Sequence, residues 1–171
     1  MANEFSLDSF VTNFGQNGGA RPYLFRWSPQ LSVGNAQSAI YMARATSLPE
    51  SNIEEIQIHW QGMANKLTGA RTYADWTITL LCDENWQIRT DFETWLSKIN
   101  SYEGGGNFAS KRSDYVTTQR LELLDYDLNP TKTVILNDAW PKAVGAITLD
   151  YSSQDIAQFD ITFAYNYFTI G

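Results

Sequence analysis

One histidine, His59, and one cysteine, Cys82, are the side chains best suited to chemistry in this sequence. A catalytic triad needs a base that is oriented by an acid and lies beside a nucleophile, and no motif around His59 supplies these partners. Cys82 ends the apolar run Thr-Ile-Thr-Leu-Leu and precedes Asp83 and Glu84, an acidic setting that disfavours a thiolate. We therefore expect Cys82 to be a small packing residue and the chain not to be an enzyme.

Two segments resemble ligand-binding loops, but each lacks a required residue. Residues 125–129, Asp-Tyr-Asp-Leu-Asn, begin like a calcium loop, yet Pro130 stands where glycine is needed and Leu136 where a bidentate glutamate is needed. The three glycines at 104–106 lack the preceding strand and following helix of a phosphate cradle. One histidine and one cysteine also exclude a Cys/His zinc site, so we expect no metal and no cofactor.

The charge balance argues against a nucleic-acid-binding protein. The 171 residues include 12 Lys or Arg and 19 Asp or Glu, which give a formal net charge of −7. Binding to nucleic acid depends on neutralising phosphates with Lys and Arg, which are scarce here. The sequence also has no apolar run near the ~20 residues of a membrane span and no signal-peptide pattern at its N-terminus, so we expect no membrane anchor.

Alternating apolar and polar residues predict a β-rich chain. In residues 53–61, Ile56, Ile58 and Trp60 fall on one face, which we expect to pack inside. Trp60, Trp76 and Trp95 all occupy positions typical of a core. The polar face of the same strand carries Glu55, Gln57, His59 and Gln61. The expected strands cover residues 22–28, 39–46, 53–61, 63–69, 74–82, 115–124, 131–138, 146–151 and 156–168.

One segment, residues 84–102, changes to helical periodicity. Its apolar stripe predicts an amphipathic helix, which Asp83 or Asn85 can cap and Gly104 can end. The stripe consists of Ile88, Phe92, Trp95, Ile99 and Tyr102, and the opposite, wet face includes Thr90, Glu93 and Ser97. A glycine-rich loop follows at 103–114.

The expected fold is mainly β, with two packed antiparallel β-sheets in a sandwich or barrel and one flanking α-helix at about 84–102. Residues 1–20 form an N-terminal arm with a short helix at 5–13, and residues 21–171 form a single domain. Sheets of this kind carry unpaired edges, which an assembly can satisfy by pairing copies of the chain.

Five segments, in order, resemble the tail tube proteins of contractile-tailed phages of the T4 type. Together they span about residues 20–168, and their order and spacing make the resemblance specific. The segments are ARPYLFRW (20–27), ARATSLPE (43–50), RTYADWTIT (71–79), AWPKAVGAITLDY (139–151) and QDIAQFDITFAYNYF (154–168).

The resemblance implies a structural subunit of tail-tube type that forms hexameric rings stacked into the inner tube of the tail. Its partners would be further copies of itself, the tail sheath protein, and the baseplate and tail terminator proteins. DNA would pass through the bore without specific binding. The protein would be assembled in the host cytoplasm and located in the virion. The alternatives are the inner tube of a phage-derived contractile injection or type VI-like secretion device that carries protein cargo and, more remotely, a carbohydrate-binding β-sandwich.

Within that expectation, three groups of residues are candidate contacts. Residues 48–73 form an arm that reaches the next ring, and its polar face either lines the bore or touches a neighbouring subunit. Asp75 pairs with Arg71 at a ring contact or makes a local turn bond to Thr72 or Thr77. The groups are Glu55, Gln57, His59 and Gln61 for the bore, Arg71, Tyr73 and Asp75 for ring or subunit contacts, and Thr90, Glu93 and Ser97 for a helix face toward the sheath.

Overall fold

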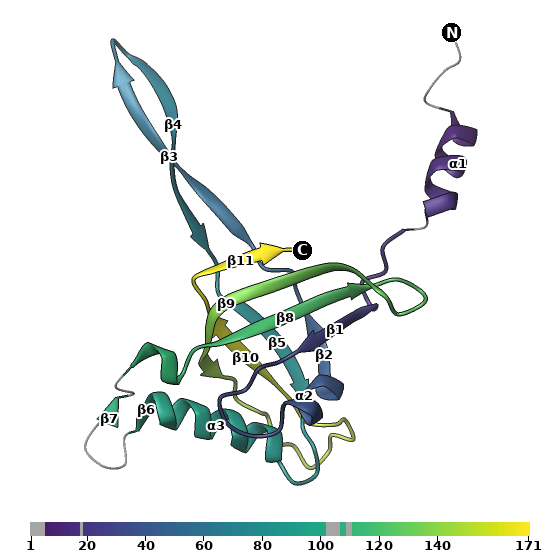
Figure 1. Ribbon diagram of the computed structural model, residues 1–171, viewed down its shortest axis with the longest axis vertical. Coiled ribbons are helices and arrows are strands. Elements are labelled where there is room, and N and C mark those ends of the chain that lie inside the picture. The colour runs from purple at the N-terminus through teal and green to yellow at the C-terminus, as the bar shows by residue number, and fades with distance from the viewer. Residues whose placement is uncertain (1–5, 18, 102–106, 109–110) are drawn as a thin grey trace.

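The body of the molecule is an antiparallel β-sheet flanked by a helix, with two projections at one end (Figure 1). The computed structural model describes residues 6–17, 19–101, 107–108 and 111–171. The elements are α1 (Leu7–Asn17), β1 (Phe25–Ser28), α2 (Ala36–Met42), β2 (Ala43–Thr46), β3 (Ser51–Trp60), β4 (Met63–Tyr73), β5 (Trp76–Leu81), α3 (Gln87–Ile99), β6 (Asn100–Ser101), β7 (Asn107–Phe108), a 3-10 turn (Arg112–Asp114), β8 (Thr117–Leu124), β9 (Pro130–Val144), β10 (Gln158–Ala164) and β11 (Tyr167–Ile170).

Strand β9 organises the large sheet because it is long enough to pair in two places. Residues 130–139 of β9 pair with β8, and Val134–Asn137 also pair with β11 on the opposite side. Residues 140–144 of β9 pair with β10, next to a register shift at Thr162/Phe163. The strand order is β1-β8-β9-β10-β5-β2, and the sheet stays open. The expectation of a mainly β, antiparallel fold is therefore confirmed, with a small second sheet formed by β3 and β4.

An aromatic cluster joins the two parts of the large sheet to α3. The Trp27 ring lies 6.4 Å from both Trp76 and Phe163, measured between ring centroids. Phe92 and Trp95 of α3 lie 6.1 and 6.2 Å from the Phe163 ring. All five side chains are buried, so each contributes about 1.5–3 kcal/mol or more through burial. The core positions expected for Trp76 and Trp95 are confirmed.

Helix α3 is shorter than the expected 84–102 because residues 84–86 form a turn. Asp83 provides the expected cap: its carboxylate accepts hydrogen bonds from the backbone N–H groups of Gln87 (3.1 Å) and Ile88 (3.3 Å). The helix ends at Ile99, since Asn100 is extended and begins β6. Gly104, the expected end, and half of the loop 103–114 lie outside the described residues.

The strand expected at 39–46 is wrong in its first half, where α2 forms. The Asn35 side chain accepts a hydrogen bond from the Gln37 N–H (3.0 Å), so it caps the helix and overrides the strand propensity of the following residues. The strand expected at 146–151 is also wrong. There Asp150 accepts hydrogen bonds from the N–H and hydroxyl of Ser152, which stabilise a turn instead.

Several other strands and helices begin or end at residues that differ from the predicted ones. Pairing with a neighbouring strand, rather than the local sequence pattern, sets where a strand ends. The turn expected at Gly69–Arg71 is absent, and β4 runs on to Tyr73 past a bulge opposite Glu54. The segment 156–168 divides into β10 and β11, with a break between Ala164 and Tyr167. The expected helix at 5–13 is present as α1 with later bounds, and β1 begins three residues later than expected.

Candidate assembly surfaces

Strands β3 and β4 form a hairpin that leaves the body as a two-stranded ribbon (Figure 1). Its tip is a two-residue turn in which Gln61 and Gly62 have φ values of 49° and 82°. Positive φ at both positions is the geometry of a type I′ turn, whose twist matches that of the flanking strands. The turn aligns Trp60 with Met63 and Ile58 with Asn65, so the register of the whole ribbon is fixed.

One face of the hairpin is an uncovered apolar stripe. The expectation that Ile56, Ile58 and Trp60 pack inside is wrong, because the ribbon has no second layer to cover them. An isolated two-stranded hairpin is marginally stable in water, and an exposed apolar patch marks an interaction site. This face, which we call the hairpin stripe, consists of Ile56 (54% exposed), Ile58 (50%), Trp60 (74%), Met63 (77%) and Leu67 (47%).

The opposite face of the hairpin is polar and carries three of the four bore candidates. Glu55, Gln57 and His59 lie on it together, whereas Gln61 belongs to the turn. The Glu55 carboxylate accepts a hydrogen bond from the Gln57 amide (2.6 Å) and pairs with Lys66 (2.9 Å). These two contacts lower the pKa of Glu55, with Gln57 as the larger cause. Sequence reasoning missed Lys66, although the short Gln-Gly turn is a signal that could have paired it with Gln57.

Aromatic packing fixes the hairpin to the body. The Tyr73 ring lies 5.6 Å from Phe168 and 6.0 Å from Tyr165. Partial burial is the main reason that the pKa of the Tyr165 hydroxyl is raised, with smaller contributions from neighbouring groups. The indole of Trp76 donates a hydrogen bond to the Ser47 carbonyl (2.7 Å) on the approach to β3. Of the contact candidates, Tyr73 is thus half-buried within its own chain.

The structure gives Asp75 a partner that neither expected alternative named. Its carboxylate forms an ion pair with Lys142 of β9 at 2.6 Å, in place of Arg71 or a neighbouring threonine. Lys142 lies 67 positions away in the sequence, so no local pattern could reveal this pair. Arg71 lies exposed on β4 opposite Ile53. Besides burial, Tyr73 and Asp75 both act on the pKa of the Tyr165 hydroxyl, so these two candidates share a neighbour at the root of the hairpin.

The face of α3 that the sequence predicts to be exposed is exposed in the structure. Thr90, Glu93 and Ser97 all lie on the solvent side, while Asp91 on the adjacent face is buried. Glu93 pairs with Arg89 one turn earlier at 2.8 Å, and this exposed pair contributes little to stability.

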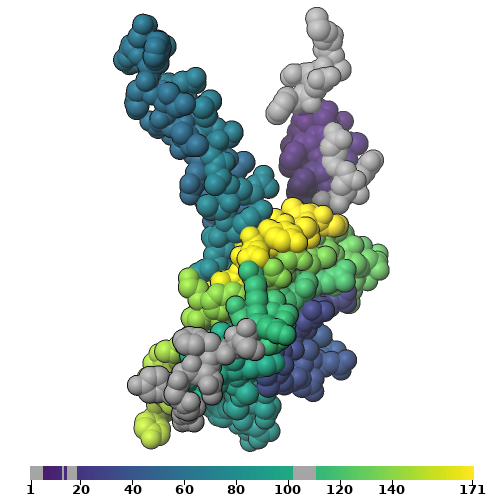
Figure 2. All heavy atoms as spheres, turned by 60° about the vertical axis from the view of Figure 1, so that its left-hand side comes forward, coloured from purple at the N-terminus to yellow at the C-terminus, as the bar shows by residue number. Residues whose placement is uncertain are grey.

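Helix α1 is a second projection with an apolar side. It stands clear of the body at the same end as the hairpin, and the two views agree on this (Figures 1 and 2). The rings of Phe10 and Phe14 stack on each other at 5.3 Å, and both remain more than half exposed. A helix with uncovered aromatic side chains on a free arm is the second candidate assembly surface.

The part of the chain that the structure describes holds no group of three or more His, Cys, Asp and Glu side chains placed to bind a metal ion. No described helix has the length and apolar character to cross a membrane. His59 stands on the exposed hairpin, and burial is the main cause that raises the pKa of the Cys82 thiol. Both projections, the hairpin and α1, carry large exposed apolar side chains.

Comparison with known proteins shows related sequences along almost the whole chain. The family model described as phage tail tube protein matches residues 8–171. The chain is 29% identical over 164 residues to tail tube protein gp19 of Enterobacteria phage T4, covering 94% of this chain and 98% of that one. It is 33% identical over 125 residues to the tail tube protein of Serratia phage KSP90, covering 72% and 70% of the two chains.

Solved structures share the fold at lower sequence identity. A chain of the sheath-tube complex of an extracellular contractile injection system (PVC) in the extended state matches with a TM-score of 0.64 and 16% identity, covering 94% of this chain and 97% of that one. A chain of the anti-feeding prophage (AFP) baseplate also gives a TM-score of 0.64, with 14% identity over 90% and 95% of the two chains. The match of the family model to residues 8–171 shows that this chain belongs to the phage tail tube protein family.

Proposed function

We propose that the chain is a structural subunit of the inner tube of a contractile phage tail, in which hexameric rings stack into a conduit for DNA. The observation that carries this proposal is the hairpin stripe on a chain of the tail tube family. A monomer gains nothing from a long apolar ribbon in water, whereas a polymer buries it. At about 25 cal/mol per Å² of buried apolar surface, covering the stripe would favour assembly strongly.

The two faces of the hairpin suit two different surroundings in such a tube. We assign the apolar face to a neighbouring copy and the polar face, with Glu55, Gln57 and His59, to the bore, with Gln61 at the tip. The Glu55 carboxylate is ionised at neutral pH, as an exposed glutamate normally is, and its lowered pKa extends that charge to more acidic conditions. Each copy adds a formal net charge of −7, so a ring would repel DNA phosphates rather than hold them. Such a bore lets DNA slide.

With the hairpin placed between copies and along the bore, the other surfaces of the subunit are left for the sheath, baseplate and terminator proteins. The outer face of α3, with Thr90, Glu93 and Ser97, is exposed and carries a single acidic side chain, so it suits a weak contact with the sheath that contraction can break. Arg71 is available for a contact between subunits. Baseplate and terminator proteins would meet the two ends of the tube. The subunit needs no catalytic activity for this role.

A second candidate function keeps the tube and changes its cargo. The fold is shared with chains from the PVC and AFP contractile injection systems, which makes a tube that carries protein cargo the alternative. The family match favours the phage tail. Isolation of native particles and identification of DNA or protein in the bore would separate the two.

Negative-stain electron microscopy of the purified, concentrated protein tests the proposal directly. We expect rings with a central hole and stacks of rings, and sedimentation velocity should show a concentration-dependent shift to large species. A protein that stays monomeric at every concentration, and that also fails to polymerise on isolated baseplates, would contradict a tube subunit.

A further inference from the structure

Two buried polar atoms of the core have no hydrogen-bond partner among the residues that the structure describes. They are the indole Nε1 of Trp27 and the amide Oε1 of Gln119. Both side chains are 0% exposed. Buried donors and acceptors nearly always have a partner, because an unpaired one costs free energy. Since Nε1 is a donor and Oε1 is an acceptor, one small molecule that accepts and donates would satisfy both.

The other two fully buried indoles show that this core normally satisfies its tryptophans. Trp76 donates to the Ser47 carbonyl at 2.7 Å, and Trp95 donates to the Tyr115 carbonyl at 3.0 Å. A buried indole N–H usually finds such a partner. Trp27 is therefore the exception among three side chains that contact the same aromatic cluster.

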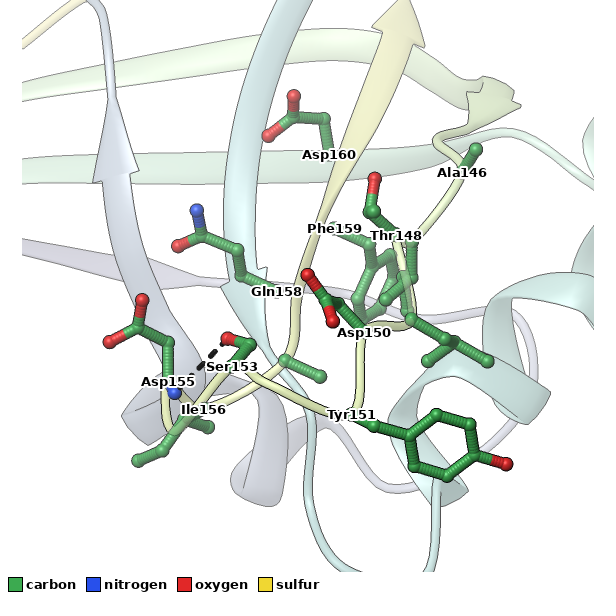
Figure 3. Close-up of a pocket in the computed structure, with 13 residues that line it drawn as sticks. Ala146, Thr148, Asp150, Tyr151, Ser153, Asp155, Ile156, Gln158, Phe159 and Asp160 are labelled. Atoms are coloured by element: carbon green, nitrogen blue, oxygen red, sulfur yellow. Dashed lines mark hydrogen bonds between the residues drawn. The ribbon is translucent and has the colours of Figure 1, made fainter.

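The hollow beside the loop between β9 and β10 shows how exposed polar groups differ from these two atoms. Residues 146–160 line this open space of about 660 Å³ (Figure 3). The Asp155 N–H donates to the Ser153 hydroxyl at 3.3 Å, and the exposed Asp150 carboxylate lies in reach of bulk solvent. A polar atom in the core lacks that recourse, so its partner must be part of the packed interior.

The pairing of β1 with β8 brings the two unpaired atoms to one face of the sheet. Trp27 lies opposite Leu121, and Gln119 precedes Leu121 by two residues, so both side chains point to the core side. Diagonal neighbours across an antiparallel pair lie about 7–8 Å apart, within reach of aromatic and other long side chains. A molecule placed between Trp27 and Gln119 can therefore contact both.

The other contacts of the Gln119 amide fix its orientation. Its Nε2 donates to the Gln30 carbonyl at 2.9 Å and to the Thr117 hydroxyl at 2.8 Å. A carbonyl oxygen only accepts, so exchanging the amide nitrogen and oxygen would place two acceptors against each other at Gln30. The amide oxygen thus faces away from Gln30, and its partner must be a donor from elsewhere.

We propose that one ordered water molecule is buried between Trp27 and Gln119, where it accepts from the indole N–H and donates to the amide oxygen. Globular proteins hold about one buried water per 27 residues, bonded to polar groups that would otherwise be unpaired. A site that is closed to solvent and offers one donor and one acceptor suits a single water. The bridge ties β1 to β8, and it does not depend on the proposed tube function.

NMR spectroscopy of the indole N–H protons tests the bridge, with Trp76 and Trp95 as internal controls. The sample is kept below the concentration at which sedimentation detects polymer. The Trp27 Hε1 proton should give a rotating-frame cross-peak to water with the sign of dipolar contact rather than of chemical exchange. The Trp76 and Trp95 protons, which bond to carbonyls, should give none. Trp27→Phe identifies the Trp27 resonance by its loss.

A matched pair of glutamine variants tests the second half of the bridge. Gln119→Met keeps a side chain of similar length but removes the acceptor, so the cross-peak between Trp27 and water should be lost. Gln37→Met makes the same change at an exposed position of α2 and should leave the cross-peak unchanged.

A high-resolution crystal or cryo-EM map supplies a second measurement on the unmodified chain, which is needed if Gln119→Met does not fold. A density maximum about 2.5–3.2 Å from both Trp27 Nε1 and Gln119 Oε1 supports the water. A map without it, or an upfield-shifted Trp27 Hε1 without a water cross-peak, overturns the bridge and places the N–H against a neighbouring ring. A cross-peak that persists in Gln119→Met also overturns it, because other groups then hold the water.

Discussion

Gly34 and Gly62 both have left-handed backbones, with φ values of 91° and 82°, but their surroundings differ. A Cβ atom at Gly34 would collide with the carboxylate of Asp91, which also accepts hydrogen bonds from Asn35 N–H and Gln87. A Cβ atom at Gly62 would meet open space. The two glycines therefore separate the cost of backbone strain from the cost of a steric collision.

Gly34→Ala should destabilise the protein more than Gly62→Ala. The strained backbone costs about 1–3 kcal/mol at either site, and at Gly34 the displaced Asp91 adds the loss of its buried hydrogen bonds, about 1–3 kcal/mol more. Urea unfolding followed by tryptophan fluorescence measures the difference. Equal losses of unfolding free energy in the two variants would show that Asp91 moves aside without cost.

Cys82 should react slowly with iodoacetamide in the folded protein. Burial, the largest cause, raises its pKa, and Asp83 adds to the shift while Arg89 opposes it, so less thiolate is present at pH 8 than in an unfolded chain. Because the folded pKa is raised, this group's contribution to stability is complete below the unfolded pKa and is lost as pH rises through the folded pKa. Alkylation followed by mass spectrometry, with and without urea, measures the rates. Equal rates would contradict the shift.

At the scale of elements, β3 and β5 show that the same alternating pattern can end in different environments. Both strands alternate apolar and other residues, yet Ile58 on β3 is 50% exposed and Ile78 on β5 is fully buried. Strand β5 lies between β2 and β10 and under the aromatic core, whereas β3 pairs only with β4 in the described structure. Coverage by other elements, and not the pattern, accounts for the difference.

Ile58→Ala and Ile78→Ala should therefore separate assembly from stability. Ile78→Ala removes buried atoms and should lower the unfolding free energy by about 2–5 kcal/mol. Ile58→Ala should change it by less than about 0.5 kcal/mol, but raise the protein concentration needed for tubes about tenfold, because the stripe buries this side chain only on assembly. Denaturant titration and sedimentation of polymer measure the two effects. Normal assembly of Ile58→Ala would argue against burial of the stripe in the tube.

The exposed face of α3 gives a second prediction at this scale. Thr90→Glu together with Ser97→Glu adds two charges to a face that carries only Glu93 among the three sheath candidates. If this face contacts the sheath, the variant should form normal bare tubes that bind sheath protein more weakly. Electron microscopy of tubes mixed with sheath protein measures the coverage. Full coverage by sheath would contradict this placement of α3.

At the scale of the whole molecule, charge and shape act together. The acidic chain has its projecting hairpin and α1 at one end and the loop between β9 and β10 at the other (Figure 1). Unlike ends favour polymers over closed dimers. A net charge far from zero keeps single copies soluble until apolar contacts outweigh the repulsion. On the hairpin face assigned to the bore, Lys66 is already paired with Glu55, so this cation would offer DNA phosphates little to bind.

Glu55→Lys should slow DNA release from assembled particles, because a ring of lysines would bind phosphates in the bore. The delay should shrink as salt concentration rises, since counterion release then drives binding less. Glu84→Lys makes the same change of charge at an exposed site before α3 and serves as the matched control. The rate of DNA release triggered in purified particles is the measurement. Equal rates for both variants would count against the bore assignment of Glu55.

The sequence by itself determined much of the local structure. The helical stripe of Ile88, Phe92 and Trp95 is buried as its spacing predicts, and Asp83 caps the helix it precedes. These features depend on neighbours within a few positions, where periodicity and capping act directly. The family resemblance rests on the same kind of information, because ordered short segments are visible in the sequence.

Only the tertiary structure decided which faces are covered. Periodicity shows that Ile56, Ile58 and Trp60 share a face, but it cannot show whether another layer lies against that face. The ion pair of Asp75 with Lys142 and the pairing of β5 with β10 likewise depend on residues far apart in the chain. Coverage and long-range pairing are properties of the packed molecule, and they decide which apolar side chains belong to the core and which remain for assembly.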